Sequence, residues 1–272
     1  MMTQRREVAA TTSVRTVEVE ALLDLALHMA NRADEIALAG FRDGSKVDIK
    51  PDGSPVTRVD REIESVIRDT IEREHPRAGV LGEEYGEEPG VGRWVIDPID
   101  GTREFVKGDP RFSVLIAYEL DDEPLLGVVS SPALGLRWWA GAGLGARRAH
   151  RGMISAARVS ITKHLSRSHG LLLGGFHSEG WPDRRGSLRL ELGLLGEGAR
   201  LNRRGVSWEA VRVAGAEFDF AFTSGHRWDV APLPVIVREA GGWAEMVETR
   251  SGLSRIAVSN RQLAVEIAGL ID

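Results

Sequence analysis

Hydrophobic residues recur at helical spacing in two segments near the start of the chain. Residues 16–40 and 57–75 each place apolar side chains three or four positions apart, which predicts two amphipathic helices. Thr57 followed by Asp60 resembles a capping box at the start of the second helix, and Pro76 ends it. The expected buried stripes are Leu22, Leu23, Leu25, Ala26, Met29, Ala30, Ala33 and Ile36 in the first helix, and Val59, Ile63, Val66, Ile67 and Ile71 in the second.

Short continuous apolar runs follow the helices, and such runs predict strands. In the second half, similar runs alternate with helical patterns, which is typical of an α/β unit. The predicted strands lie at residues 93–97, 112–120, 125–134, 136–146, 170–176, 219–225 and 255–260, and the later helices at 207–217, 230–242 and 261–271.

We therefore predict two parts, an α+β part over residues 1–150 and a smaller α/β part over residues 151–272. No low-complexity linker separates them, so we expect the two parts to pack as one unit. The length of 272 residues is enough for one large core or two joined subdomains.

Composition and charge exclude several classes of protein. A net charge of -5 argues against a general nucleic-acid binder, although a small anionic substrate stays possible because local charge can oppose net charge. The chain contains no cysteine, which excludes disulfides, thiolate metal sites and cysteine nucleophiles. No run approaches about 18 apolar residues, and the first segment lacks the apolar core of a signal peptide. We expect no membrane span and a cytoplasmic location.

Acidic residues gather in three places where apolar segments end. Glu83 and Glu84 follow one apolar stretch, Asp97 and Asp100 flank a rigid Pro98 at the end of another, and Asp229 lies where a helix is expected to start. Carboxylates placed together repel one another, and a hard divalent cation such as Mg²⁺ would remove that repulsion because it prefers oxygen ligands.

The stretch from Asp97 to Thr102 can serve both a metal and a phosphate. Two aspartates three apart across a stiff turn can point the same way, and the Ile99 carbonyl between them is a further oxygen ligand. Gly101 lets the backbone approach an anion, and Thr102 begins a predicted helix whose first N–H groups suit phosphate.

Each acidic group also has a structural explanation. Asp-Pro and Asp-Gly pairs commonly form turns, Glu83 and Glu84 fit a solvated loop, Asp229 fits an N-cap and Asp60 a capping box. The spacing of Asp97 and Asp100 does not fit a calcium EF-hand, which needs acids at alternate positions. On spacing alone, a metal site and a set of surface turns on a structural protein both stay open.

Four segments together resemble the inositol monophosphatase family of Mg²⁺-dependent phosphomonoesterases. They are KPDGSPVTRVDREIE, LGEEYG, WVIDPIDGTREFVKGDPRFSVLIAY and HRWDVAPLPVIVREAGG, which span residues 50 to 242 in the family's order. The resemblance implies an α/β fold, an alternating αβαβα layered sandwich of two tightly packed subdomains. It also implies a homodimer and two or three Mg²⁺ ions per site, with Mn²⁺ as a substitute.

The resemblance also gives individual residues a role. It implies that Glu83, Asp97, the Ile99 carbonyl, Asp100 and Asp229 hold the metal, and that Gly101 and Thr102 hold phosphate. The residues that it implies near the attacking water are Glu83, Thr102 and Asp60.

The resemblance implies a small phosphate monoester as substrate, and the chain most resembles the histidinol-phosphate phosphatase branch of the family. Inositol-1-phosphate or another sugar or cyclitol phosphate, adenosine 3',5'-bisphosphate, and ligand binding without turnover stay as alternatives. An acid that contacts substrate in much of the family falls here on Phe222, seven residues before Asp229. The candidate substrate contacts are Arg103, Ser207, His226 and Arg227, with Trp208 and Glu209 close by in sequence.

Overall fold

The computed structural model describes residues 2–44, 47–50, 55–173, 184–202, 205–249 and 252–271. The helices in this part of the chain are α1 (Met2–Asp43), α2 (Arg58–Glu74), α3 (Thr102–Val106), α4 (Arg184–Gly196), α5 (Arg227–Val230), α6 (Leu233–Glu239) and α7 (Ala264–Ile271). The 3₁₀ helices are η1 (Pro132–Leu134), η2 (Leu165–Arg167) and η3 (Ser207–Gly215).

The strands form two main sheets and one short ribbon. The eight-stranded sheet has the order β10-β9-β8-β7-β6-β5-β3-β4, the five-stranded sheet the order β12-β11-β13-β15-β14, and β1 pairs with β2. The strands are β1 (Val47–Ile49), β2 (Pro55–Thr57), β3 (Gly79–Gly82), β4 (Gly86–Glu88), β5 (Arg93–Asp100), β6 (Ser113–Leu120), β7 (Glu123–Ser131), β8 (Leu136–Gly141), β9 (Gly145–His150), β10 (Met153–Ala156), β11 (His169–Leu172), β12 (Arg200–Asn202), β13 (Phe220–Gly225), β14 (Gly242–Glu248) and β15 (Ser254–Asn260).

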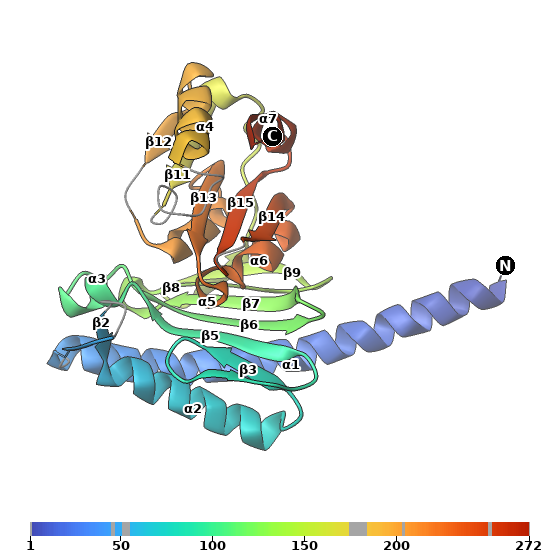
Figure 1. Cartoon of the computed structure of the whole chain (residues 1–272). Helices are drawn as coiled ribbons and strands as arrows, with labels where there is room; N and C mark the ends of the chain where they lie inside the picture. Colours follow the sequence, from blue (N-terminus) through green and yellow to red (C-terminus); the bar gives the residue numbers. More distant parts are fainter. Residues whose placement is uncertain are drawn as a thin grey trace.

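The sheets and helices stack in five layers, which confirms the predicted αβαβα sandwich. Figure 1 shows α1 and α2 on one face of the eight-stranded sheet, α5 and α6 between the two sheets, and α4 and α7 on the outer face of the five-stranded sheet. Strand β6 shows why the layers form. Val114 and Ile116 pack in the core with α1 and α2, whereas Leu115 packs in the core between the sheets. A strand buried on both faces has no polar alternation, so it appears in the sequence as a continuous apolar run.

The start of α2 has the predicted capping box. The Thr57 hydroxyl accepts a hydrogen bond from the Val59 N–H at 3.1 Å, and the Asp60 carboxylate accepts one from the Thr57 N–H at 2.9 Å. The helix ends at Glu74, before Pro76, as expected. Residues of both predicted stripes, such as Met29 and Ile63, are buried in the core beneath the eight-stranded sheet.

Several elements differ from the sequence predictions. The first helix begins at Met2 instead of residue 16, and the predicted helix at 207–217 is the 3₁₀ helix η3. Strands β9, β10 and β14 were not predicted, because none has a continuous apolar run; all four residues of β10 are exposed. Strand β10 ends at Ala156 and joins the eight-stranded sheet, so this sheet extends past residue 150. The last residues of the predicted strand at 170–176 lie outside the described residues.

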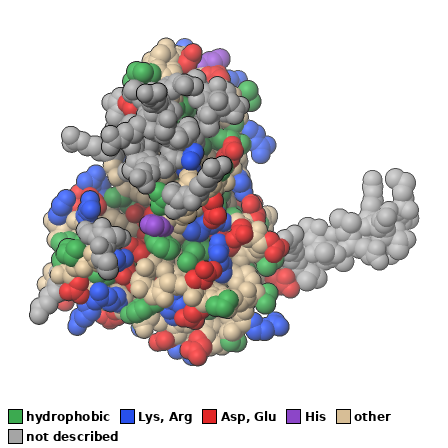
Figure 2. Space-filling model, viewed as in Figure 1, with side chains coloured by type: hydrophobic (Ala, Val, Ile, Leu, Met, Phe, Trp, Pro, Cys, Tyr) green, Lys and Arg blue, Asp and Glu red, His purple; other side chains and the backbone are tan. Residues whose placement is uncertain are grey.

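The surface carries charges of both signs. On the face drawn in Figure 2, basic side chains are scattered among acidic ones. No helix in the described ranges is long and apolar enough to cross a membrane.

Candidate active site

A β-bulge at the end of β5 brings Asp97 and Asp100 to the same face of the sheet. In a regular strand, residues three apart point to opposite faces. Here Asp97 pairs with Leu115 and Asp100 with Ser113, so three steps along β5 match two along β6. The extra residue re-aims the following side chains. Pro98 suits the bulge because proline has no N–H to donate to the neighbouring strand.

Asp229 approaches the two aspartates from α5, in the other half of the chain. Helix α5 is a single turn that begins directly after β13 and His226. Asp229 is its third residue and accepts a hydrogen bond from the His226 N–H at 2.6 Å, so Asp229 is not the N-cap residue. Gly225 makes room for this arrangement, because a Cβ there would lie 2.2 Å from Asp229 Oδ2.

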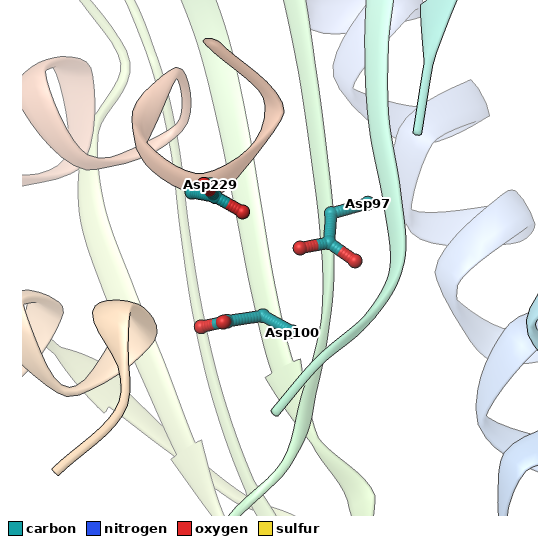
Figure 3. Close-up of side chains that lie close together, drawn as sticks. All are labelled: Asp97, Asp100 and Asp229. Atoms are coloured by element: carbon teal, nitrogen blue, oxygen red, sulfur yellow. The ribbon is translucent and has the colours of Figure 1, made fainter. Parts of the chain in front are cut away.

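The three carboxylates form one acidic cluster, which we define as Asp97, Asp100 and Asp229. One carboxylate oxygen from each residue lies within 4.8 Å of one from each of the other two. Figure 3 shows Asp97 and Asp100 on their strand facing Asp229 on its helix. The cluster therefore joins the eight-stranded sheet to the layer between the sheets.

The acidic cluster is electrostatically unfavourable without a cation. Burial raises the pKa of Asp97 and Asp100 well above the usual value of 3.8, and neighbouring carboxylates raise it further. Burial, followed by Glu83, raises the pKa of Asp229 to about 7. Asp97 is 1% exposed, and its Oδ1 has no hydrogen-bond partner within the described part of the chain. A buried carboxylate oxygen without a partner, surrounded by other carboxylates, fits a divalent metal ion well.

Glu83 adjoins the acidic cluster and also contacts a lysine. Its carboxylate raises the pKa of all three aspartates of the cluster. The Lys50 ammonium donates to Glu83 Oε1 and to Glu84 Oε1, both at 2.8 Å. Burial, opposed by Lys50, raises the pKa of Glu84 to about 7. The buried Glu64 holds this turn by accepting from the Glu84 N–H at 2.7 Å.

Asp60 and Thr102 connect α2 to the bulge. The Thr102 hydroxyl lies 3.2 Å from Asp60 Oδ1 and 3.1 Å from the Ile99 carbonyl, and it can donate to either. Asp60 is fully buried, and burial raises its pKa. Gly101 between the bulge and α3 has a φ of 90°, which strongly favours glycine. The structure thus brings together Asp60, Glu83, Asp97, Ile99, Asp100, Gly101, Thr102 and Asp229.

The second half of the chain also contacts Asp100 through its backbone. The Trp208 N–H donates to Asp100 Oδ2 at 2.8 Å, and this bond partly counters the rise in the Asp100 pKa. Ser207 beside it is partly exposed. No sequence pattern indicates the hydrogen bond, because every non-proline residue carries an N–H.

The candidate substrate contacts separate into two groups. Arg103 and His226 are exposed, and the His226 ring stacks on Trp228 at 4.6 Å. Arg227 is different and corrects our expectation, because its guanidinium is buried against Glu119 instead of facing solvent. Phe222 is fully buried in the core that β13 shares with α7, so its ring cannot contact a substrate at the acidic cluster.

We expect the acidic cluster to make the metal-free protein less stable as the pH rises. The folded state raises the pKa of these carboxyls, so between pH 4 and pH 7 the folded protein binds more protons than the unfolded chain. For Asp229 the penalty is absent below the usual value of 3.8 and complete above about 7, and the raised pKa values of Asp97 and Asp100 act in the same direction. The melting temperature of EDTA-treated protein should therefore fall as the pH rises between these two values.

The control for this pH dependence is Asp229→Asn, which removes one titrating group while keeping a similar shape. The fall in melting temperature should be smaller in that variant, and smaller in wild type with saturating Mg²⁺. Identical pH profiles for wild type and Asp229→Asn without metal would contradict the interpretation.

Comparison with known proteins gives consistent matches over nearly the whole chain. The family model described as the inositol monophosphatase family matches residues 18–270. A histidinol-phosphatase of Mycobacterium tuberculosis is 41% identical over 224 residues, covering 81% of this chain and 85% of that protein. A histidinol-phosphatase of Streptomyces coelicolor is 37% identical over 259 residues, covering 92% of this chain and 96% of that protein. The solved structure of Thermotoga maritima IMPase matches with a TM-score of 0.76 at 27% identity, covering 92% of this chain and 96% of that one.

Proposed function

Because this chain belongs to the inositol monophosphatase family and is a phosphoric monoester hydrolase, we propose that it hydrolyses histidinol phosphate in a Mg²⁺-dependent reaction. The observation that carries the proposal is the convergence of Asp97, Asp100 and Asp229 within 4.8 Å. Two relatives named histidinol-phosphatase, at 41% and 37% identity, support the choice of substrate.

The proposed metal ligands are all oxygens. They are the carboxylates of Glu83, Asp97, Asp100 and Asp229 and the Ile99 carbonyl, and Mg²⁺ or Mn²⁺ suits such a set. When bound, Mg²⁺ would supply Lewis-acid polarisation of the phosphate and lower the pKa of the attacking water.

The protein's own residues would orient and deprotonate the water. The Thr102 hydroxyl can donate to Asp60 and at the same time accept a hydrogen bond from a water on its other side. Burial raises the pKa of Asp60, so its carboxylate accepts a proton more readily than an exposed aspartate. We propose that the water gives one proton to the Thr102 hydroxyl oxygen, which at the same time gives its own proton to Asp60, while Gly101 and Thr102 bind the phosphate oxygens.

The substrate's organic part would lie near His226 and Arg103, the two exposed candidates. The His226 ring stacked on Trp228 provides an aromatic surface three residues before Asp229, which suits a substrate with an imidazole ring. Ser207 is the third candidate, next to the backbone bond from Trp208 to Asp100. A homodimer and a cytoplasmic location, both expected from the sequence, stay predictions.

We expect histidinol phosphate to be the preferred substrate in a panel of phosphate esters. Its kcat/KM should exceed those of inositol 1-phosphate, a sugar phosphate and adenosine 3',5'-bisphosphate by at least about tenfold, the scale of discrimination that a shaped pocket achieves. Phosphate release measures the rates, and the Asp97→Ala variant in the same panel excludes a contaminating phosphatase.

Two results would count against this proposal. If another ester is preferred, histidinol phosphate is not the substrate, but the protein is still a phosphatase. Tight binding of histidinol phosphate by calorimetry, with no product over hours, would favour ligand binding without turnover.

A further inference from the structure

Arg227 joins α5 to the eight-stranded sheet through buried charged contacts. It is the first residue of α5 and is 8% exposed, and its Nε donates to Glu119 Oε1 at 2.7 Å. A second guanidinium nitrogen donates to the Asp122 carbonyl in the turn between β6 and β7. The carboxylate of Glu248, on the exposed side, lies 3.7 Å from the third nitrogen. The side chain is therefore fixed at two points on the sheet.

Glu119 continues the connection to β5. It is 1% exposed, and its second oxygen accepts from Arg93 Nε at 3.1 Å. Arg93 lies directly across from Glu119 in the β5–β6 ladder and also donates to the Asp122 carboxylate at 3.0 Å. We call these contacts the Arg93–Glu119–Arg227 ion pairs. They link the first residue of the strand that ends in Asp97 and Asp100 to the first residue of the helix that carries Asp229.

Helix α5 needs such an anchor. It has four residues, and a single turn has no stability of its own in water. Its apolar contacts do not fix its direction along the sheet: Trp228 and Ala231 pack against Val95 and Ala117, and Val230 lies in the core between the sheets. The acidic cluster opposes this contact, because the charged form of Asp229 repels the aspartates on β5. Arg227 counters that repulsion from the start of the same turn.

We propose that Arg227 is a positioning residue, which through the Arg93–Glu119–Arg227 ion pairs sets the distance between Asp229 and the aspartates of β5. This inference rests on the proposed function, in which those carboxylates hold Mg²⁺. A buried ion pair is weak evidence for stability, since its desolvation can cost as much as the attraction gains. Its geometry is restrictive, however, because the planar guanidinium donates in fixed directions to two acceptors.

The test is Arg227→Met, with Mg²⁺ affinity measured in the absence of substrate from the rise in melting temperature with added Mg²⁺. We expect affinity to fall by about tenfold or more, the usual effect of removing a residue that orients metal ligands. The Mg²⁺ concentration for half-maximal turnover should rise by the same factor. Turnover at saturating Mg²⁺ should stay within about threefold of wild type, because the guanidinium donates to Glu119 and the Asp122 carbonyl and would not act on the substrate.

The matched control is Arg137→Met. Arg137 donates to Asp34 at 2.6 Å and joins β8 to α1, a partly buried ion pair on the other face of the sheet. We expect it to lower the melting temperature without changing Mg²⁺ affinity. Equal loss of affinity in both variants would overturn the inference, because a general loss of stability would then explain it. Wild-type affinity in folded Arg227→Met would overturn it as well.

Arg227→Lys decides the question if Arg227→Met does not fold. Lysine keeps the charge and one bond to Glu119 but cannot donate in two fixed directions, so an intermediate affinity supports the inference and wild-type affinity overturns it. Wild-type protein that neither binds Mg²⁺ nor releases phosphate would overturn the proposed function and this inference with it. Normal wild-type binding with an unaffected Arg227→Met would overturn the inference alone.

Discussion

Asp229→Asn should lower turnover at least about a hundredfold while leaving the fold intact. Asparagine replaces an anion with a neutral oxygen at a site where divalent cations and phosphate must be balanced. Loss of a directly placed group at such a site costs on the order of 3 kcal/mol of transition-state stabilisation, which corresponds to that factor. The fold should survive because asparagine can still accept the hydrogen bond from the His226 N–H at 2.6 Å.

The measurements are the rate of phosphate release at increasing Mg²⁺ and the melting temperature without metal. High Mg²⁺ should restore only part of the rate. The melting temperature should equal or exceed that of wild type, because the substitution removes one of the repelling carboxylates. Asp69→Asn, on the exposed surface of α2, is the control and should keep wild-type turnover. Wild-type turnover in Asp229→Asn would remove Asp229 from the site.

Removal of divalent metal should abolish turnover. We expect a loss of about a thousandfold or more after dialysis against EDTA, since a metal ion at a transferring phosphoryl group contributes several kcal/mol. Mg²⁺ should restore the rate fully, and Mn²⁺ should support turnover. Ca²⁺ should inhibit, because it forms longer bonds with looser geometry.

The control for metal removal is an assay with EDTA already saturated with Mg²⁺, which separates chelation from a direct effect of EDTA. Phosphate release that persists in metal-free buffer would contradict the proposed mechanism. Equal rates with Ca²⁺ and Mg²⁺ would contradict the proposed choice of metal.

The main layers could be predicted from the sequence because burial on both faces leaves a direct pattern. The continuous run at 112–120 becomes β6, and the stripes at 16–40 and 57–75 become faces of α1 and α2. Strand β10 could not be found in this way, since all its residues are exposed and it depends on pairing with β9. Local pattern carries no information on such pairing.

The residues of the acidic cluster could be predicted from the sequence, but the geometry that brings them together could not. Asp97 and Asp100 share a face only because β5 contains a bulge, and a regular strand with the same spacing would separate them. For Arg227, in contrast, the sequence predicted a role that the structure does not support. A charged residue beside Asp229 suggested a substrate contact, and the structure buries it against Glu119. The burial of Arg227 could have been suspected from Glu119, because an acid near the end of the apolar run of β6 needs a basic partner when it is buried.

The burial of Phe222 limits how the active site of this protein can be redesigned. Phe222 is fully buried, and its ring centroid lies 5.8 Å from that of Phe220. Leu263 and Ile267 belong to the same core. Introducing an acid by Phe222→Glu would place a carboxylate among apolar side chains at a cost of several kcal/mol, a large share of the stability of a typical domain. A design that needs an acid at position 222 therefore has to rebuild the core around β13 first, because a single substitution there places the charge in that core.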